Sequence, residues 1–129
     1  MNQNVVLLVE DEALIMMDVQ EGLEEAGFTV HCAKDAAEAL ARFDRNPTGI
    51  RAVVTDIKLG NGDTGWDIAF HIRQAIPTMP IVYMSGDSAA DWPARGVPNS
   101  VMVQKPFAMA QIIAAVTTLL NALPPIASD

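Results

Sequence analysis

Short apolar runs alternate with longer amphipathic stretches along the whole chain. The runs are apolar or β-branched and are bounded by turn residues, which is typical of buried strands. They are residues 5–9, 50–55, 79–84 and 100–103, with residues 28–32 as a weaker candidate. Apolar residues at helical spacing predict helices over residues 12–26, 35–44 and 66–76, and a last helix from near residue 106. Pro93 interrupts residues 88–95, so we expect a short or distorted helix there.

Five repeats of strand then helix predict an α/β fold with a doubly wound parallel sheet. Parallel strands need crossover connections, and the crossover helices cover both faces of the sheet. In such sheets ligands bind at the carboxyl ends of the strands, near the point where the strand order reverses. The length of 129 residues suits one domain, since domains commonly have about 100–200 residues. We expect a core over about residues 4–123 and a tail at residues 124–129, without an output domain.

Composition and charge narrow the function classes. The chain is 50% hydrophobic and 19% charged, a globular mixture. Sixteen Asp and Glu residues against eight Lys and Arg give a formal charge of −8, which argues against direct binding to nucleic acid or anionic membranes. The run at residues 5–9 is too short for a signal peptide or a membrane span. Cys32, the single cysteine, cannot form an internal disulfide, so we expect a cytoplasmic protein.

Polar side chains stand at the carboxyl ends of four predicted strands. They are Glu10 and Asp11, Asp56, Ser85 and Lys105. In a parallel sheet they would converge on one edge, where neighbouring carboxylates repel one another unless a cation is present. A hard divalent ion such as Mg²⁺ prefers such oxygen ligands. A cation, a lysine and a hydroxyl around one aspartate suit phosphoryl transfer, with the aspartate as nucleophile.

With these residues the chain resembles the receiver domains of two-component response regulators. The resemblance covers about residues 4–123 and rests on four motifs in order: Val9-Glu10-Asp11-Glu12, Val53-Val54-Thr55-Asp56-Ile57-Lys58-Leu59, Tyr83-Met84-Ser85-Gly86 and Lys105-Pro106-Phe107. It implies a five-stranded (βα)5 flavodoxin-like fold with strand order 2-1-3-4-5. It also implies a stand-alone signalling domain, not an enzyme, that receives a phosphoryl group from a histidine kinase or a histidine phosphotransfer protein.

The resemblance also assigns roles to residues. Asp56 would be the phosphoacceptor, and Glu10, Asp11, Asp56 and the main-chain carbonyl of Lys58 would hold Mg²⁺. Ser85 would bond a phosphoryl oxygen and Lys105 would pair with it. Both side chains would move inward, and Ser85 would draw residues 86–91 with it. A cis peptide is expected before Pro106.

The chain departs from the family pattern at several positions. Gly60 stands where a proline is common, and the loop at residues 60–65 is one residue longer than usual, with three glycines that predict mobility. Met102 stands where the family has a switch aromatic, so we expect a weaker or differently routed switch. The interrupted fourth helix is a further departure.

Two surface features complete the predictions. Lys58 and Asp87 lie two residues beyond Asp56 and Ser85, and their opposite charges predict an ion pair across the site that tunes the lifetime of the phosphorylated state. In the last helix, Ile113 and Leu120 flank the apolar stripe and are candidates for docking a downstream target or a second copy.

Three alternatives remain open. One is a receiver-fold adaptor that acts independently of phosphorylation. A phosphatase of the haloacid-dehalogenase type also uses a nucleophilic aspartate, but it needs a second aspartate at the position of Lys58. A flavodoxin-like carrier of flavin mononucleotide needs a phosphate loop after the first strand, where the acidic residues 10–12 would repel the cofactor.

Overall fold

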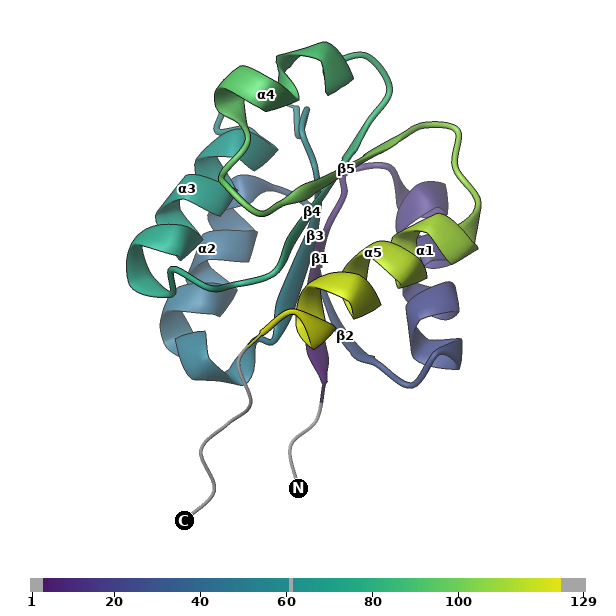
Figure 1. Cartoon of the computed structure of the whole chain (residues 1–129), viewed down its shortest axis with the longest axis horizontal. Helices are drawn as coiled ribbons and strands as arrows, with labels where there is room; N and C mark the ends of the chain where they lie inside the picture. The colour runs from purple at the N-terminus through teal and green to yellow at the C-terminus, as the bar shows by residue number, and fades with distance from the viewer. Residues whose placement is uncertain (1–3, 61, 124–129) are drawn as a thin grey trace.

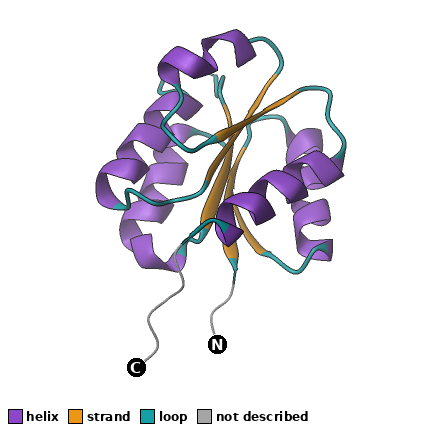
Figure 2. Ribbon diagram, in the orientation of Figure 1, coloured by secondary structure: helices purple, strands orange, loops and turns teal. Residues whose placement is uncertain are grey.

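The computed structural model describes residues 4–60 and 62–123 and contains one parallel sheet with helices on both faces (Figures 1 and 2). The five strands are β1 (Val5–Val9), β2 (Thr29–Ala33), β3 (Ala52–Asp56), β4 (Ile81–Ser85) and β5 (Val101–Gln104). Their order is β2-β1-β3-β4-β5, and every neighbouring pair is parallel. The predicted fold class and strand order are confirmed. The order reverses between β1 and β3, which places a binding crevice at their carboxyl ends.

The helices divide between the two faces of the sheet (Figure 1). Helices α1 (Ala13–Glu25) and α5 (Met109–Asn121) cover one face. Helices α2 (Ala36–Arg45), α3 (Gly65–Ala75) and α4 (Trp92–Arg95) lie on the other. Short 3₁₀ turns precede β3 (η1, Pro47–Gly49) and α4 (η2, Ala89–Asp91). Among the described residues, no helix has the length and apolar content that crossing a membrane requires.

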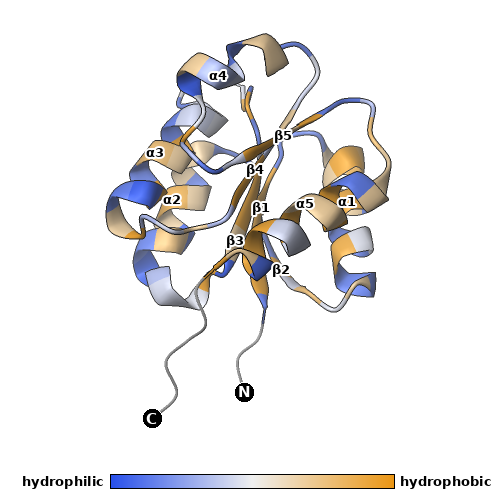
Figure 3. Ribbon diagram, in the orientation of Figure 1, coloured by the Kyte–Doolittle hydropathy of each residue, from blue (hydrophilic) through white to orange (hydrophobic). Residues whose placement is uncertain are grey.

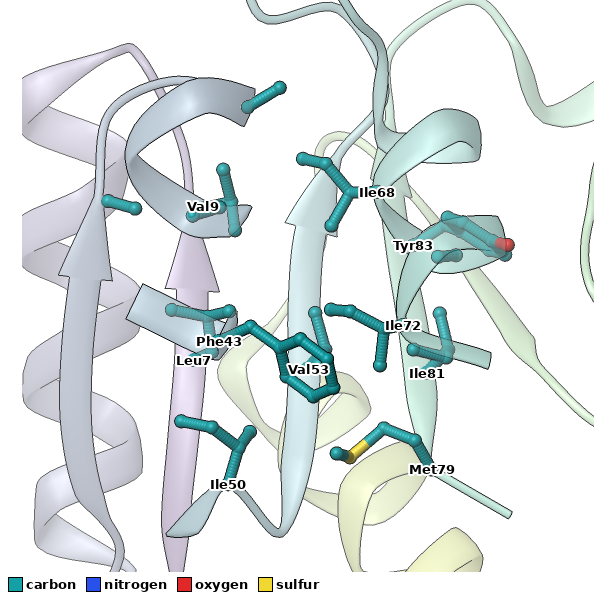
Figure 4. Packing of buried hydrophobic residues seen from close by; sticks show 14 of the residues in the cluster. Leu7, Val9, Phe43, Ile50, Val53, Ile68, Ile72, Met79, Ile81 and Tyr83 are labelled. Carbon is teal, nitrogen blue, oxygen red and sulfur yellow. The ribbon is translucent and has the colours of Figure 1, made fainter. Parts of the chain in front are cut away.

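Two hydrophobic clusters hold the layers together, one on each face of the sheet. In β1, Val5, Leu7 and Val9 enter the first cluster, and Val6 and Leu8 enter the second. Both faces of this strand are covered, which explains its uninterrupted apolar sequence. The first cluster, beneath α2 and α3, includes the fully buried residues Leu7, Phe43, Ile68, Ile72, Ile81 and Tyr83 (Figure 4). Figure 3 shows hydrophobic strands inside and polar residues on the outer sides of the helices.

Four strands lie one or two residues further along the chain than the sequence pattern predicts. The pattern marked residues 28–32, 50–55, 79–84 and 100–103, and the strands are 29–33, 52–56, 81–85 and 101–104. Ile50, Met79 and Ser100 are buried but lie outside the strands. The sequence pattern therefore identified buried residues, some of which do not pair with a neighbouring strand. As a consequence, Asp56 and Ser85 are the last residues of β3 and β4.

The fourth helix is reduced to four residues, as Pro93 led us to expect. Pro93 lies in its first turn, where a missing N–H costs no hydrogen bond, and the 3₁₀ turn η2 precedes it. The indole of Trp92 is half-buried against the first cluster. Residue 61 of the glycine loop and the predicted tail at residues 124–129 lie outside the described residues.

Candidate functional site

The polar residues that the sequence predicts at the strand ends do converge on one edge of the sheet. Glu10 follows β1, Asp56 and Ser85 end β3 and β4, and Lys105 follows β5. Although charged or polar, Glu10, Asp56 and Ser85 are only 0%, 6% and 1% exposed. A cleft of about 600 Å³ opens above them. This acidic cleft is lined by residues that include Asp11, Asp56, Lys58, Ser85, Asp87 and Lys105.

Lys105 is shared between the two buried carboxylates. Its Nζ lies 2.9 Å from Asp56 Oδ2 and 3.3 Å from Glu10 Oε2. The remaining oxygens accept main-chain N–H groups: Asp56 Oδ1 from Ile57 at 2.8 Å, and Glu10 Oε1 from Glu12 at 3.1 Å. The peptide between Lys105 and Pro106 is cis, as expected. The carboxylate of Asp56 is therefore fixed at both oxygens.

One lysine does not fully offset the acidity of the site. Burial, and next the charge of Asp56, raise the pKa of Glu10 to about 7, against the lowering effects of the Glu12 N–H and Lys105. Burial alone would lower the pKa of Lys105, but its bond to Asp56 and the charges of Asp56 and Glu10 outweigh it, so the pKa is raised. The site thus holds Lys105 charged and has capacity for further positive charge.

The donor set fits a hard divalent cation. Glu10, Asp11 and Asp56 each offer a carboxylate oxygen, and these oxygens all lie within 4.8 Å of one another. Oxygen-only ligation with one solvent-exposed carboxylate, Asp11, is what Mg²⁺ accepts, because Mg²⁺ keeps several of its waters. A cation here would also relieve the repulsion that raises the pKa of Glu10.

Ser85 is positioned by the loop that follows it. Its Oγ accepts the N–H of Ser88 at 2.7 Å and that of Asp87 at 3.2 Å. Both bonds use the oxygen as acceptor, so the hydroxyl hydrogen can donate to an oxygen placed in the cleft. The Ser85 hydroxyl is therefore bonded directly to two main-chain amides of this loop.

Lys58 and Asp87 form the predicted ion pair across the acidic cleft. Lys58 Nζ lies 2.7 Å from Asp87 Oδ2, and both side chains are well exposed, at 70% and 63%. The bond to Lys58, and next the hydroxyl of Ser88, lower the pKa of Asp87. The effect of the pair on phosphoryl lifetime stays a prediction.

Three further predicted residues lie away from the cleft. Met102, in β5, is half-buried against the first cluster. Ile113 and Leu120 are half-buried and pack against the second cluster, so α5 presents mainly small and polar residues to solvent. Docking through Ile113 and Leu120 stays a prediction. These two residues expose less apolar surface than the apolar stripe of the last predicted helix led us to expect.

Gly65 is a residue of the site that the sequence reasoning treated only as a flexible loop residue. A Cβ at this position would lie 2.2 Å from the carbonyl oxygen of Asp56, so α3 can begin directly against β3 only with glycine here. The Gly65 N–H donates to Ile57 O at 2.8 Å, and a capping box between Thr64 and Asp67 fixes the helix start. The sequence did offer a signal for this role, because Gly65 lies between Thr64, a favourable cap residue, and the amphipathic pattern predicted from residue 66.

Comparisons with known proteins agree with this geometry. The family model described as the response regulator receiver domain matches residues 6–117. A crystal structure of a response regulator receiver protein from Sinorhizobium medicae is 41% identical, with a TM-score of 0.90 over 93% of this chain and 96% of that one. The receiver domain of NtrX from Brucella abortus is 28% identical, with a TM-score of 0.78 over 92% and 99%.

Curated relatives match over most of this chain but only part of their own length. The transcriptional regulatory protein PrrA of Mycobacterium leprae is 33% identical over 120 residues, which are 90% of this chain and 49% of PrrA. The sensor kinase CckA of Brucella abortus is 31% identical over 119 residues, 90% of this chain and 12% of CckA. The chain thus spans about half the length of these relatives, or less.

Proposed function

The chain belongs to the response regulator receiver domain family, and on that premise we propose that Asp56 takes a phosphoryl group from phosphohistidine and that this changes the protein's interaction surface. The observation that carries the proposal is the buried Asp56 carboxylate, bonded to Lys105 at 2.9 Å, within 4.8 Å of oxygens from Glu10 and Asp11. Receiver domains are signalling domains that interact with histidine kinases and phosphotransfer proteins.

The residues divide the reaction between them. One Asp56 oxygen forms the bond to phosphorus while the P–N bond breaks and the imidazole keeps the electron pair. Lys105 and the hydroxyl of Ser85 stabilise the charge on the phosphoryl oxygens, and fixed donors of this kind supply much of the rate in phosphoryl transfer. Ser85 then draws the loop at residues 86–91 with it, through the amides of Asp87 and Ser88.

Mg²⁺ is the cation that we assign to the site. Glu10, Asp11 and Asp56 would hold it, with the main-chain carbonyl of Lys58 as a further ligand. When bound, it would offset the negative charge that three carboxylates and a phosphoryl group place in one cleft. Without it, the approach of a phosphoryl dianion to these carboxylates would be opposed by repulsion.

Helix α1 offers a surface for the phosphodonor. Leu14 and Met17 are 78% and 62% exposed, the two most exposed residues of α1 among the large hydrophobic side chains. Beside them a groove of about 640 Å³ runs to the start of α5 and is lined by Lys105 as well as by the acidic residues of α1. A histidine-bearing protein with an apolar helix and basic flanks would fit this groove, which reaches Lys105, the partner of Asp56. A later target or a second copy at Ile113 and Leu120 remains part of the proposal.

Other features define the protein more broadly. We interpret residues 1–129 as one receiver domain, which is cytoplasmic because its single cysteine cannot form an internal disulfide. Its charge of −8 argues against binding to nucleic acid or membranes. The alternative is a receiver-fold adaptor that acts without phosphorylation. The buried carboxylate pair speaks against the adaptor, because burying two neighbouring carboxylates costs stability and an adaptor would gain nothing from that cost.

Intact-mass measurement tests the function. Incubation with acetyl phosphate and Mg²⁺ should add one phosphoryl group to the wild type, and omission of Mg²⁺ or the change Asp56→Asn should prevent this. Asp63→Asn, which removes an exposed carboxylate of the nearby loop, is the matched control and should be phosphorylated normally. An unmodified wild type would favour the adaptor, and a modified Asp56→Asn would show that Asp56 is not the acceptor.

A second experiment tests the donor surface on α1. Leu14→Lys with Met17→Lys should slow transfer from a panel of autophosphorylated histidine kinase domains by about tenfold or more, as loss of central interface contacts does. Phosphorylation by acetyl phosphate should not change. Phe70→Lys, on α3 and 63% exposed, is the control. Equal transfer to all three proteins would show that the donor binds elsewhere.

A further inference from the structure

Tyr83 joins the interior of the sheet to the segment between α4 and β5. Its side chain is fully buried in the first cluster, with its ring 4.7 Å from that of Trp66. Figure 4 shows the hydroxyl directed away from Leu7 and Val53. This hydroxyl accepts the main-chain N–H of Val97 at 3.1 Å. A side chain of β4 therefore reaches the surface segment that follows α4.

The α4–β5 segment, residues 96–100, is held by other side chains as well. The hydroxyl of Ser100 donates to the Val97 carbonyl at 2.6 Å and accepts the indole N–H of Trp92 at 2.9 Å. Arg73 of α3 donates to the carbonyls of Pro98 and Asn99 at 2.6 and 3.3 Å. Side chains thus bind both the N–H and the carbonyl of Val97, and through Trp92 they connect the segment to α4.

Tyr83 is also close to the proposed phosphoryl site. It lies two residues before Ser85 in β4, and side chains two apart in a strand point to the same face of the sheet. Its partner in the neighbouring strand is Met102, the position where the family has a switch aromatic. The aromatic ring therefore stands one strand away from the expected position, between Ser85 and the α4–β5 segment.

We propose that Tyr83, rather than residue 102, couples phosphorylation to the surface in this protein, through the hydrogen bond from the Val97 N–H to the Tyr83 hydroxyl. The proposal rests on the proposed function of Asp56. When Ser85 moves toward the phosphoryl group, the end of β4 moves with it, and the Tyr83 hydroxyl shifts relative to the Val97 amide. The responsive surface is then the α4–β5 segment with Trp92.

The hydroxyl rather than the ring carries this coupling. The ring is packed in the first cluster against Trp66 and has no exposed surface, and close-packed interiors transmit small displacements. Met102 is unbranched and flexible, so it can repack beside Tyr83 without passing on a displacement. Removal of one oxygen atom, in Tyr83→Phe, should therefore uncouple the surface and keep the core.

Amide hydrogen exchange of residues 96–100 tests the proposal, with and without Mg²⁺ and acetyl phosphate. In the wild type, phosphorylation should change exchange at Val97 severalfold. In Tyr83→Phe, exchange at Val97 should be about 2- to 10-fold faster before phosphorylation, as expected for one lost hydrogen bond, and should not respond further. Met102→Leu, a volume-conserving change, is the control and should respond as the wild type does.

The outcomes separate this inference from the proposed function. If intact mass shows phosphorylated Tyr83→Phe and residues 96–100 still respond as in the wild type, the coupling is not through Tyr83. Loss of the response in Met102→Leu alone would return the switch to position 102. If the wild type is not phosphorylated at all, the proposed function and the inference fail together.

Discussion

The acidic cleft lies at the carboxyl end of β4, and the α4–β5 segment lies toward the amino end of the same strand. Different interactions hold these two regions. In the cleft, two buried carboxylates share one lysine, and the pKa of Glu10 is raised to about 7 by burial and by Asp56. In the segment, neutral hydroxyls and one arginine bind main-chain groups, and the Val97 N–H and carbonyl are both bonded.

The difference indicates where a ligand acts and where its effect is detected. The cleft has more negative charge than Lys105 offsets, so binding a cation or a phosphoryl group changes its electrostatic energy strongly. The segment has satisfied hydrogen bonds, so it has one well-defined geometry that a displaced partner can disturb. This chain has the acidic cluster typical of a receiver phosphorylation site, with Lys105 paired to Asp56, and departs from the family pattern at Met102 and the short α4.

The largest expected effect on the acidic cleft comes from loss of the Lys105 ammonium group. In Lys105→Met, Glu10 and Asp56 lose their shared cation, and the phosphoryl oxygens lose a positive partner at the cleft. We expect phosphorylation by acetyl phosphate to slow by about 100-fold, as for the loss of one preorganised charge-stabilising donor. The time course of intact mass measures this rate. Lys34→Met, an exposed lysine after β2, is the control, and equal rates in both variants would contradict the role of Lys105.

The close contact between α3 and β3 can be tested next. In Gly65→Ala the new methyl group would lie 2.2 Å from the carbonyl oxygen of Asp56, so α3 or β3 must shift. We expect a loss of about 1–3 kcal/mol in the free energy of unfolding, typical of overpacking, and slower phosphorylation. Gly86→Ala is the control, because a Cβ there meets nothing within 4 Å. Chemical denaturation measures the free energy of unfolding of both variants, and equal values would contradict the close contact between α3 and β3.

Most of the fold and the cleft could be predicted because they depend on repeating or local patterns. Buried parallel strands give uninterrupted apolar runs such as residues 5–9, and the residue at the end of each run falls at one edge. Asp56 and Lys105 were therefore predictable as neighbours although 49 residues separate them. The predicted bounds of the strands were less accurate, because Met79 and Ser100 are buried although they do not belong to a strand.

The α4–β5 segment could not be predicted because its contacts follow no period. Tyr83 reads as one more apolar residue of a buried strand, and nothing in the pattern shows that its hydroxyl reaches Val97. Arg73 lies in a helix 25 residues before Pro98, whose carbonyl it binds. Such contacts between irregular backbone and single side chains depend on the final packing. The sequence did indicate the region, through Met102 and Pro93, but not the replacement contacts.

The pH at which Tyr83 loses its proton tests whether its hydroxyl is buried against the α4–β5 segment. Burial raises the pKa of Tyr83 above its usual value of about 10, against the lowering effects of the Val97 N–H and Arg73. Because the unfolded chain then loses this proton at lower pH than the folded one, stability should fall as pH rises above about 10. Tyr83 is the only tyrosine, so tyrosinate absorbance reports it alone.

In native protein the absorbance midpoint should lie at higher pH than in denaturant. Tyr83→Phe should lose part of the decrease in stability above pH 10, since it removes the group that titrates. A native midpoint at or below the denatured one would mean that the hydroxyl is solvated and is not held against Val97.

The smallest effect on stability is expected at the ion pair between Lys58 and Asp87, which lies across the cleft but is open to solvent. Exposed pairs contribute little to folding, so Lys58→Ala and Asp87→Ala should unfold at the wild-type denaturant concentration. Their phosphorylated forms should nevertheless lose the phosphoryl group at rates that differ severalfold from the wild type, as we expect if the pair limits the approach of water to Asp56. Arg95→Ala, at an exposed cation of α4, is the control. Decay of the phosphorylated mass after removal of the donor measures the lifetime. Wild-type decay in both variants would leave the pair as a surface contact without a role in the chemistry of the cleft, and would confine control of the lifetime to the buried residues beneath it.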